Sequence, residues 1–213
     1  EDTVLAVTGA EMELRVNGQA APSWEAVAVR EGDVVSFGFL TAGARIYIAV
    51  AGGIDVPAVL GSRCTYAIGG FGGFEGRALQ AGDVLPTGAA SALPGRAVPA
   101  DLRSSFSREV EVRVVMGLYD YRLAEAGLRA FLDEEWTLSP VADRMGFRYS
   151  GPALEWVERE QPFGAGSDPS NIVDAGYPLG SIQVPGGLEP IILHRDAVSG
   201  GGYAMVATVI SAD

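Results

Sequence analysis

The stretch that decides the fold is residues 11–18, which read Glu11-Met12-Glu13-Leu14-Arg15-Val16-Asn17-Gly18. Polar and apolar side chains alternate along it up to the Asn-Gly pair. Alternation with a period of two turns one face toward a core, and Asn-Gly favours a tight turn because both residues tolerate positive φ. The stretch therefore predicts a half-buried strand that enters a β-hairpin.

Similar runs predict strands along the rest of the chain. Val34–Leu40 and Arg45–Val50 flank Thr41–Ala44, which predicts a second hairpin with its turn at 41–44. Arg45–Val50 is β-branched and aromatic, as expected of a central strand. Further strands are predicted at Val110–Met116, Ser181–Val184, Pro190–His194 and Tyr203–Ser211.

One helix is predicted, over Tyr121–Glu135, because apolar residues recur roughly on one face from Leu123 to Leu132. Gly127 lies in its middle, where glycine costs about 1 kcal/mol relative to alanine. One helix among about ten strands and glycine-rich turns predicts a mainly β protein of the barrel type.

Composition excludes several classes of function. The net charge of −12 argues against a nucleic-acid or anionic-membrane partner. All 15 basic residues are arginines, so no lysine is present for a Schiff base, a Walker motif or biotinylation. Cys64 is the single cysteine, which excludes an internal disulfide, and no apolar run approaches the roughly 20 residues of a membrane span. No signal peptide is visible, and we expect a cytoplasmic location.

Two subdomains are expected, because the segment from Pro86 to Ser107 is rich in Ala, Pro, Gly and Ser. The predicted boundaries are a first subdomain at 1–88, a linker at 89–107 and a second subdomain at 108–213.

The glycine-rich segment Gly69–Gly76 does not fit a nucleotide motif. Walker A requires a lysine, and the dinucleotide fingerprint requires a following helix, whereas another turn follows here. The glycines are interpreted as tight turns, with a ligand loop of backbone N–H groups as the alternative. Exposed Phe71 and Phe74 would favour a binding surface.

Single chemically active residues do not form a complete catalytic set. His194 is the lone histidine, which excludes a two-histidine metal site, and no metal is expected. Beside Asp196 it could be an oriented general base or an ordinary strand-end histidine. Cys64 is interpreted as an inert thiol. Arg144, next to Asp143 and a Gly turn, suits bidentate carboxylate recognition and equally suits a structural salt bridge.

Several motifs together resemble the allophanate hydrolase subunit 2 family, whose members are also called biotin-dependent carboxyltransferases or the C subunit of 5-oxoprolinase. The strongest stretch is Gly43–Pro57, which continues into Val59–Thr65. The other matching stretches follow in family order: Val7–Ala10 before it, then Gly76–Asp83, Ala142–Gly146, Gly180–Pro185, Pro190–Leu193 and Gly201–Tyr203.

The resemblance implies tandem cyclophilin-like β-barrels that work beside a subunit-1 homologue. Family pairs form the carboxyltransferase part of urea carboxylase, or open 5-oxoproline with ATP and a third protein of the lactam-utilisation type. ATP or biotin is then expected through partner subunits, and the substrate is a small amide or lactam. A further family type antagonises a sporulation kinase inhibitor. The family's N-terminal segment and its last barrel strand are expected to be missing here.

The resemblance also marks candidate site residues. The expected substrate-binding residues are Arg45, Ser62, Arg63 and Thr65, and the expected catalytic residues are Arg144, Gln183, Asp196 and Tyr203. Arginines would recognise an anion or carbonyl, the Gln183 amide would donate or accept hydrogen bonds, and Tyr203 would polarise the substrate. Three departures stand out: Cys64 replaces the usual Ser, His194–Gly200 replaces a shorter Asp-Gln-Thr run, and Gly117–Asp120 lacks a Pro-Gln pair.

Two functions follow from the resemblance. The first is the subunit-2 half of a carboxyltransferase-like or ATP-dependent lactam hydrolase complex. The alternative is a regulatory protein that binds and antagonises its subunit-1 partner, in which case Phe71 and Phe74 would be contact residues.

Overall fold

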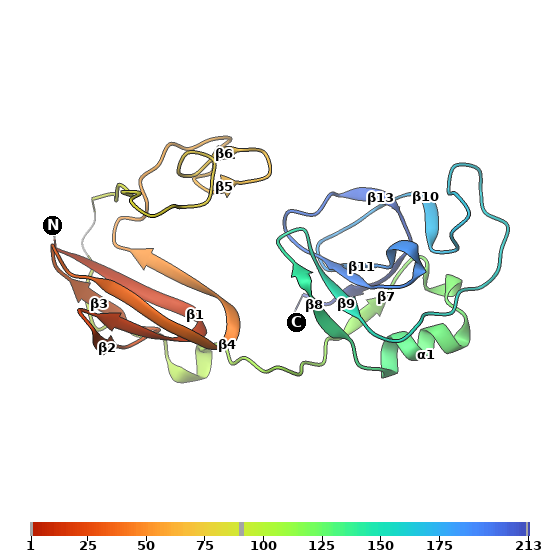
Figure 1. The fold of residues 1–213 in the computed structure, drawn as a ribbon, viewed down its shortest axis with the longest axis horizontal. Coiled ribbons are helices and arrows are strands. Elements are labelled where there is room, and N and C mark those ends of the chain that lie inside the picture. The colour runs from red at the N-terminus through yellow and green to blue at the C-terminus, as the bar shows by residue number, and fades with distance from the viewer. Residues whose placement is uncertain (1, 90–91, 212) are drawn as a thin grey trace. The chain divides into compact units, whose positions relative to one another are not determined.

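The computed structural model describes residues 2–89, 92–211 and 213. The chain divides into two compact units, Glu1–Val110 and Glu111–Asp213. Strands dominate both units in Figure 1, and the described residues contain one α-helix. The predicted mainly β fold is therefore confirmed, whereas closure of the sheets into barrels stays a prediction. Within the described parts of the chain, no helix has the length and apolar character that a bilayer span requires.

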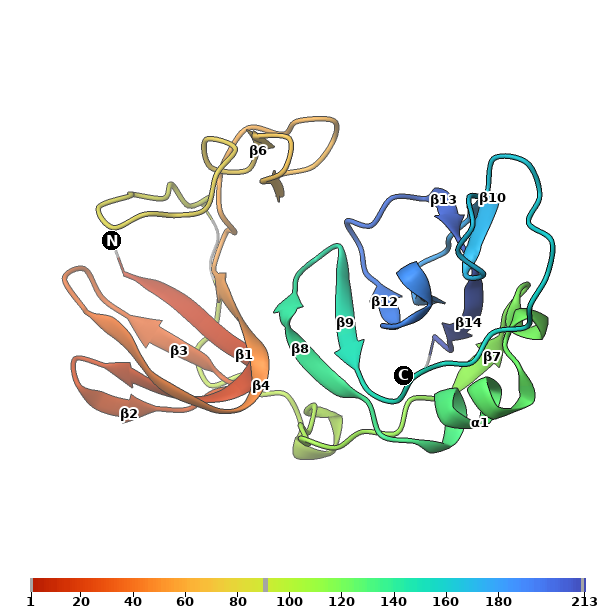
Figure 2. The same cartoon turned by 45° about the vertical axis from the view of Figure 1, so that its right-hand side comes forward.

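Two long strands organise the first unit. β1 (Thr3–Val16) and β4 (Val35–Val50) pair antiparallel, as Figure 2 shows. β2 (Gln19–Ala21) and β3 (Ala26–Val29) also pair antiparallel with β1. Apolar side chains from β1, β3 and β4 form the core of this four-stranded sheet.

The hairpin predicted at residues 11–18 is confirmed. Asn17 and Gly18 have φ of 52° and 79°, and the chain returns as β2 with Val16 opposite Gln19. Leu14 turns inward and is 1% exposed, while its neighbours Glu13 and Arg15 form an ion pair on the outer face. The alternation of polar and apolar residues in the sequence therefore corresponds to the exposed and the buried face of this strand.

The second predicted hairpin is wrong, because residues 41–44 lie inside β4 and do not turn. Ala42 pairs with Glu11, and the register between β1 and β4 shifts at several points around this pair. Gly43 has φ of 77°, and a Cβ there would lie 2.8 Å from the Cβ of Ala10. The glycine thus permits an irregularity that bends a long strand pair, where the sequence pattern indicated a turn.

The segment predicted as linker, 89–107, contains residues 90 and 91, which lie outside the described residues. Its later part bonds to the first unit: the Ala26 N–H donates to the Arg96 carbonyl at 2.8 Å, and the Val98 N–H donates to the Trp24 carbonyl at 2.9 Å. The first unit extends to Val110. The boundaries at 88 and 107 stay a prediction.

A repeated Gly-Asp turn stabilises the first unit at two places. Asp33 and Asp83 each accept a backbone N–H from three residues earlier, at 2.8 Å and 2.7 Å. Asp83 also accepts two hydrogen bonds from the guanidinium of Arg77, at 2.8 Å and 2.9 Å. The Arg77 bonds, followed by the bond from the Gln80 N–H, lower the pKa of Asp83 from 3.8 to about 2.

This shift predicts a pH-dependent contribution to stability. Because the folded pKa of Asp83 is depressed, its contribution is present above about pH 4 and is lost as the pH falls toward about 2. We expect Asp83→Asn to be less stable than the parent at pH 5, with the difference shrinking toward pH 2. Thermal unfolding from pH 2 to 5 measures this, with the exposed Asp101→Asn as control. A difference that is constant with pH would contradict it.

The second unit is built on a six-stranded sheet in the order β7-β14-β11-β12-β9-β8. Its strands are β7 (Val114–Met116), β8 (Thr137–Ala142), β9 (Gly146–Ser150), β11 (Ser181–Gln183), β12 (Ile191–Leu193) and β14 (Met205–Val209). β10 (Asn171–Gly176) and β13 (Gly200–Tyr203) form a separate antiparallel pair. These elements match the strands predicted near 110–116, 181–184, 190–194 and 203–211.

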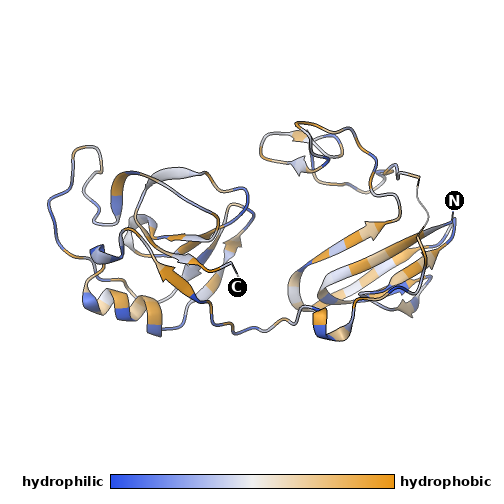
Figure 3. Cartoon of the chain, turned by 180° about the vertical axis from the view of Figure 1, so that it is seen from behind, coloured by the Kyte–Doolittle hydropathy of each residue, from blue (hydrophilic) through white to orange (hydrophobic). Residues whose placement is uncertain are grey.

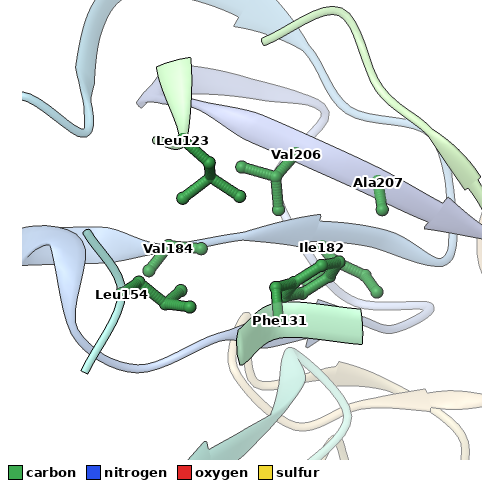
Figure 4. Packing of buried hydrophobic residues seen from close by; sticks show 7 residues of the cluster. All are labelled: Leu123, Phe131, Leu154, Ile182, Val184, Val206 and Ala207. Atoms are coloured by element: carbon green, nitrogen blue, oxygen red, sulfur yellow. The ribbon is translucent and has the colours of Figure 1, made fainter. Parts of the chain in front are cut away.

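The core of this unit joins the helix to the sheet. Figure 4 shows the side chains of the buried cluster that consists of Leu123, Phe131, Leu154, Ile182, Val184, Val206 and Ala207. Helix α1 (Glu125–Asp133) contributes Phe131, and in Figure 3 hydrophobic and hydrophilic residues alternate around its turns. The amphipathic pattern that predicted the helix therefore corresponds to a buried face and a solvent face, although Leu132, predicted on the apolar face, is 50% exposed.

The helix is shorter than the predicted 121–135. A 3-10 turn, Asp120–Arg122, precedes it, and Leu123 is extended with φ of −74° and ψ of 133°. Leu123 forms a β-bridge with Trp156, and the Ala124 N–H donates to the Glu155 carbonyl at 2.9 Å. Pairing with this distant segment takes Leu123 out of the helix.

Candidate functional site

The most specific polar geometry in the second unit is the pair of Arg144 and Asp196. The guanidinium donates from Nε to Oδ2 at 2.7 Å and from Nη2 to Oδ1 at 2.9 Å. Two parallel hydrogen bonds of this kind fix the plane of the guanidinium as well as its position. The Arg144 side chain is 65% exposed and that of Asp196 is 20% exposed. The pair thus holds the Arg144 guanidinium in a fixed orientation that solvent and solutes can reach.

The partner of Arg144 differs from the one that the sequence suggested. Asp143, its neighbour, accepts the backbone N–H groups of Met145 and Gly146 at 2.8 Å and 3.2 Å, which closes the turn between β8 and β9. Asp196 lies 52 positions later in the chain. A second bond, from the Asp196 N–H to the Arg144 carbonyl at 2.9 Å, joins the two segments through their backbones. Asp143 therefore shapes the turn, and Asp196 holds the side chain.

Electrostatics favour the ionised form of Asp196 in this pair. The hydrogen bonds from Arg144 hold the pKa of Asp196 below its usual value, against a smaller opposing effect of burial. His194 lies two residues before Asp196, and its ring centroid is 4.7 Å from that of Phe147. The backbone N–H of His194 donates to the Met145 carbonyl at 3.0 Å, so its backbone belongs to the same turn. A role for His194 as general base stays a prediction.

Gln183 and Tyr203 lie on other strands of the same unit. Gln183 on β11 sits between Ile191 of β12 and Met205 of β14 and is 9% exposed. Its Oε1 is buried and has no hydrogen-bond partner within the described residues. A buried acceptor without a partner is costly, so this amide is available to a ligand or a water molecule.

Tyr203 ends β13 with its side chain 40% exposed. Its backbone is held by Tyr177, whose hydroxyl donates to the Tyr203 carbonyl at 2.7 Å and accepts from the Tyr203 N–H at 2.8 Å. Burial raises the pKa of Tyr177. Tyr177 is absent from the residues predicted from the sequence, because no local motif reveals a bond between residues 26 positions apart.

The four predicted substrate-binding residues all lie in the first unit and are exposed. Arg45 is in β4, Ser62 and Arg63 lie in the loop that leads into β5 (Thr65–Tyr66), and Thr65 is the first residue of β5. Ser62 Oγ accepts the Cys64 N–H at 3.1 Å. Arg63 donates from Nε to the Val56 carbonyl at 2.8 Å and contacts Asp55 at 3.4 Å. These bonds shape the loop, and binding of substrate there stays a prediction.

The glycine-rich segment Gly69–Gly76 contains β6 (Phe71–Gly72), which pairs with β5 in a small antiparallel hairpin. Turn formation is thus its structural role: a Cβ on Gly73 would lie 1.9 Å from Thr65 Oγ1, and Gly73 has φ of 55°. Phe71 is exposed and packs on Tyr66 with 5.3 Å between ring centroids. Phe74 is half-buried beneath the Arg77 guanidinium.

No group of three or more His, Cys, Asp or Glu side chains suited to a metal ion occurs among residues 2–89, 92–211 and 213.

Comparison with known proteins identifies the class. The family described as carboxyltransferase domain, subdomains A and B, matches residues 1–213, and the chain belongs to this family. The resemblance found in the motifs is thereby confirmed.

Two relatives of this chain are named as a urea amidolyase and as a subunit of 5-oxoprolinase. The urea amidolyase of Lachancea kluyveri is 36% identical over 226 residues, and the C subunit of the 5-oxoprolinase of Escherichia coli is 34% identical over 215 residues. Both alignments cover 100% of this chain, which spans 12% of the first protein and 64% of the second. The crystal structure of the K. lactis urea amidolyase matches 99% of this chain with a TM-score of 0.90 and 34% identity, over 13% of its own length.

Proposed function

We propose that this chain acts as the subunit-2 type component of a two-component carboxyltransferase-like or ATP-dependent amide or lactam hydrolase complex. The observation that carries the proposal is the match of the carboxyltransferase family to residues 1–213. The relatives named as a urea amidolyase and as a subunit of 5-oxoprolinase support it, because both names denote cleavage at an amide-type carbon–nitrogen bond.

In this proposal the chain supplies recognition and electrostatics, and a subunit-1 homologue completes the complex. The chain has no lysine to carry biotin, so a carboxyl group on biotin, or activation by ATP, arrives through partner proteins. Arg144, oriented by Asp196, stabilises the negative charge that develops on a carboxylated or phosphorylated intermediate. Gln183 offers an amide to the substrate, and Tyr203 polarises its carbonyl.

A regulatory function is the second candidate, and the β5–β6 hairpin favours it. Ile68 is 66% exposed and Phe71 is 43% exposed, so apolar side chains on this loop are available to a protein partner. In this alternative the hairpin binds a subunit-1 homologue, and the pair turns over no substrate.

Reconstitution distinguishes the two candidates. The protein is combined with its subunit-1 homologue and a lactam-utilisation type protein, and glutamate release from 5-oxoproline is measured with and without ATP. We expect ATP-dependent release that requires this chain. Urea is the parallel substrate, with a biotinylated partner present. Stable binding of the subunit-1 homologue without turnover of either substrate would instead support the regulatory function.

A further inference from the structure

Arg122 and Arg159 occupy an unusual polar region of the second unit, where the chain after β9 pairs with the 3-10 turn Asp120–Arg122. The Val157 N–H donates to the Arg122 carbonyl at 2.9 Å, and Leu123 forms a bridge with Trp156. This pairing brings Arg159 toward Arg122. Arg144, in contrast, lies in the turn at the start of β9, so the two regions are at opposite ends of that strand.

The guanidinium of Arg122 is buried, with the residue 2% exposed. Its Nη1 donates to the Asn171 carbonyl at 2.5 Å and lies 3.5 Å from the Pro169 carbonyl. The Tyr119 ring covers one face, 5.5 Å from the central carbon. Its Nε is buried and has no hydrogen-bond partner among the described residues. A strong donor is therefore left unused in the interior.

Arg159 shows the same feature. Its Nη2 donates to Gln161 Oε1 at 3.2 Å, but its buried Nε has no partner in the described parts of the chain. Asp168, which follows in the same segment, uses Oδ1 to accept from the Ser170 N–H at 2.8 Å and from the Ser170 hydroxyl at 2.5 Å. No ion pair with a carboxylate is found for either arginine among residues 2–89, 92–211 and 213.

Unpaired polar atoms concentrate in this region. Four buried side-chain atoms lack a partner in the described residues: two are the Nε donors of Arg122 and Arg159, which an oxyanion can bind, and two are the acceptors Asn171 Oδ1 and Gln183 Oε1. Burial lowers the pKa of Arg122 and the charge of Arg159 lowers it further, whereas a side-chain hydrogen bond with Tyr121 and the nearby Tyr119 oppose this shift. A buried charge without a counter-ion is strongly unfavourable. Such an arrangement is unexpected in a chain that carries 27 acidic residues.

We propose that Arg122 and Arg159 form a binding site for a small oxyanion, with carboxylate, bicarbonate or phosphate oxygens accepting the unused N–H groups of both guanidinium ions. The shared chemistry is an anion with at least two acceptor oxygens, which guanidinium groups bind with directed hydrogen bonds. The site is separate from the Arg144–Asp196 pair. It does not depend on the proposed function of that pair.

Anion-dependent stability tests the site on the full chain. Thermal unfolding and calorimetric titration are carried out with sodium phosphate, bicarbonate or acetate, against chloride at equal ionic strength. At about 100 times the dissociation constant we expect the melting temperature of the second unit to rise by roughly 10 °C. A rise with acetate and bicarbonate only identifies a planar anion, and a rise with phosphate only identifies a tetrahedral one.

Two variants connect the effect to the site. Arg159→Gln removes the charge at the half-buried position, and we expect it to weaken binding about tenfold or more. Arg159→Lys, which retains a cation, should bind with intermediate affinity and serves if the glutamine variant does not fold. Arg129→Gln on α1, which loses an exposed charge paired with Glu125, should bind like the parent. Equal stabilisation by chloride, an undiminished effect in Arg159→Gln, or binding of none of the three oxyanions would overturn the proposal.

Discussion

Replacing Arg144 with alanine is expected to lower turnover by the reconstituted complex by about 10²- to 10³-fold. The guanidinium is held by two hydrogen bonds to Asp196 and is exposed to solutes. Removal of a preorganised cation leaves developing negative charge without its partner, which affects kcat more than KM. Steady-state kinetics with 5-oxoproline and ATP measures the change, and binding of the subunit-1 homologue should persist.

Two controls distinguish catalysis from structure. Arg148→Ala removes another exposed charge, from β9 after the same turn, and should retain full turnover. Asp196→Asn keeps the shape of the partner but not its charge, so we expect a smaller loss than for Arg144→Ala. If the pair is only structural, both changes will reduce the melting temperature and turnover in parallel. Unchanged turnover in Arg144→Ala would remove this residue from the site.

The second large effect concerns stability at Gly127. A Cβ there would lie 2.2 Å from the Glu155 carbonyl oxygen and 2.8 Å from the Glu155 nitrogen. Helix propensity alone predicts that alanine stabilises α1 by about 1 kcal/mol. Overlap with a backbone that cannot move aside reverses this sign, and we expect Gly127→Ala to lower the free energy of unfolding by about 2 kcal/mol.

Urea unfolding measures the change through Trp136 and Trp156, both in the second unit. All proteins carry Trp24→Phe, so that fluorescence reports this unit alone. Ala126→Gly, at an exposed position of the same helix, is the matched control and should lose only about 1 kcal/mol by propensity. A Gly127→Ala variant as stable as its parent would show that the helix can move away from Glu155.

The parts of the fold that were predicted correctly are those that depend on residues close together in the sequence. The hairpin at Asn17-Gly18 follows from alternation and from two residues that accept positive φ. Helix α1 follows from its apolar stripe. The wrong turn at 41–44 had the same kind of local signal. Gly43 marks a turn or an irregular strand pair equally well, and only the pairing of β4 with β1 distinguishes them.

The candidate site was predicted only in part for the same reason. Arg144 and Asp196 were both named from the resemblance to the family, but their contact joins residues 52 positions apart. Asp143 was the nearer carboxylate in sequence, yet its side chain bonds to the backbone of the turn. Tyr177, which fixes Tyr203, carried no local signal at all.

By itself, the sequence determined the mainly β class, the first hairpin, the amphipathic helix and membership of the carboxyltransferase family, since these depend on short-range patterns and motif order. Tertiary structure decided which carboxylate holds Arg144, where the helix begins, and why Gly127 is tolerated in its interior. It also decided that Arg122 and Arg159 meet in a buried region without an acidic partner among the described residues. Such contacts depend on strand register and burial, which place distant residues together and remove water from them.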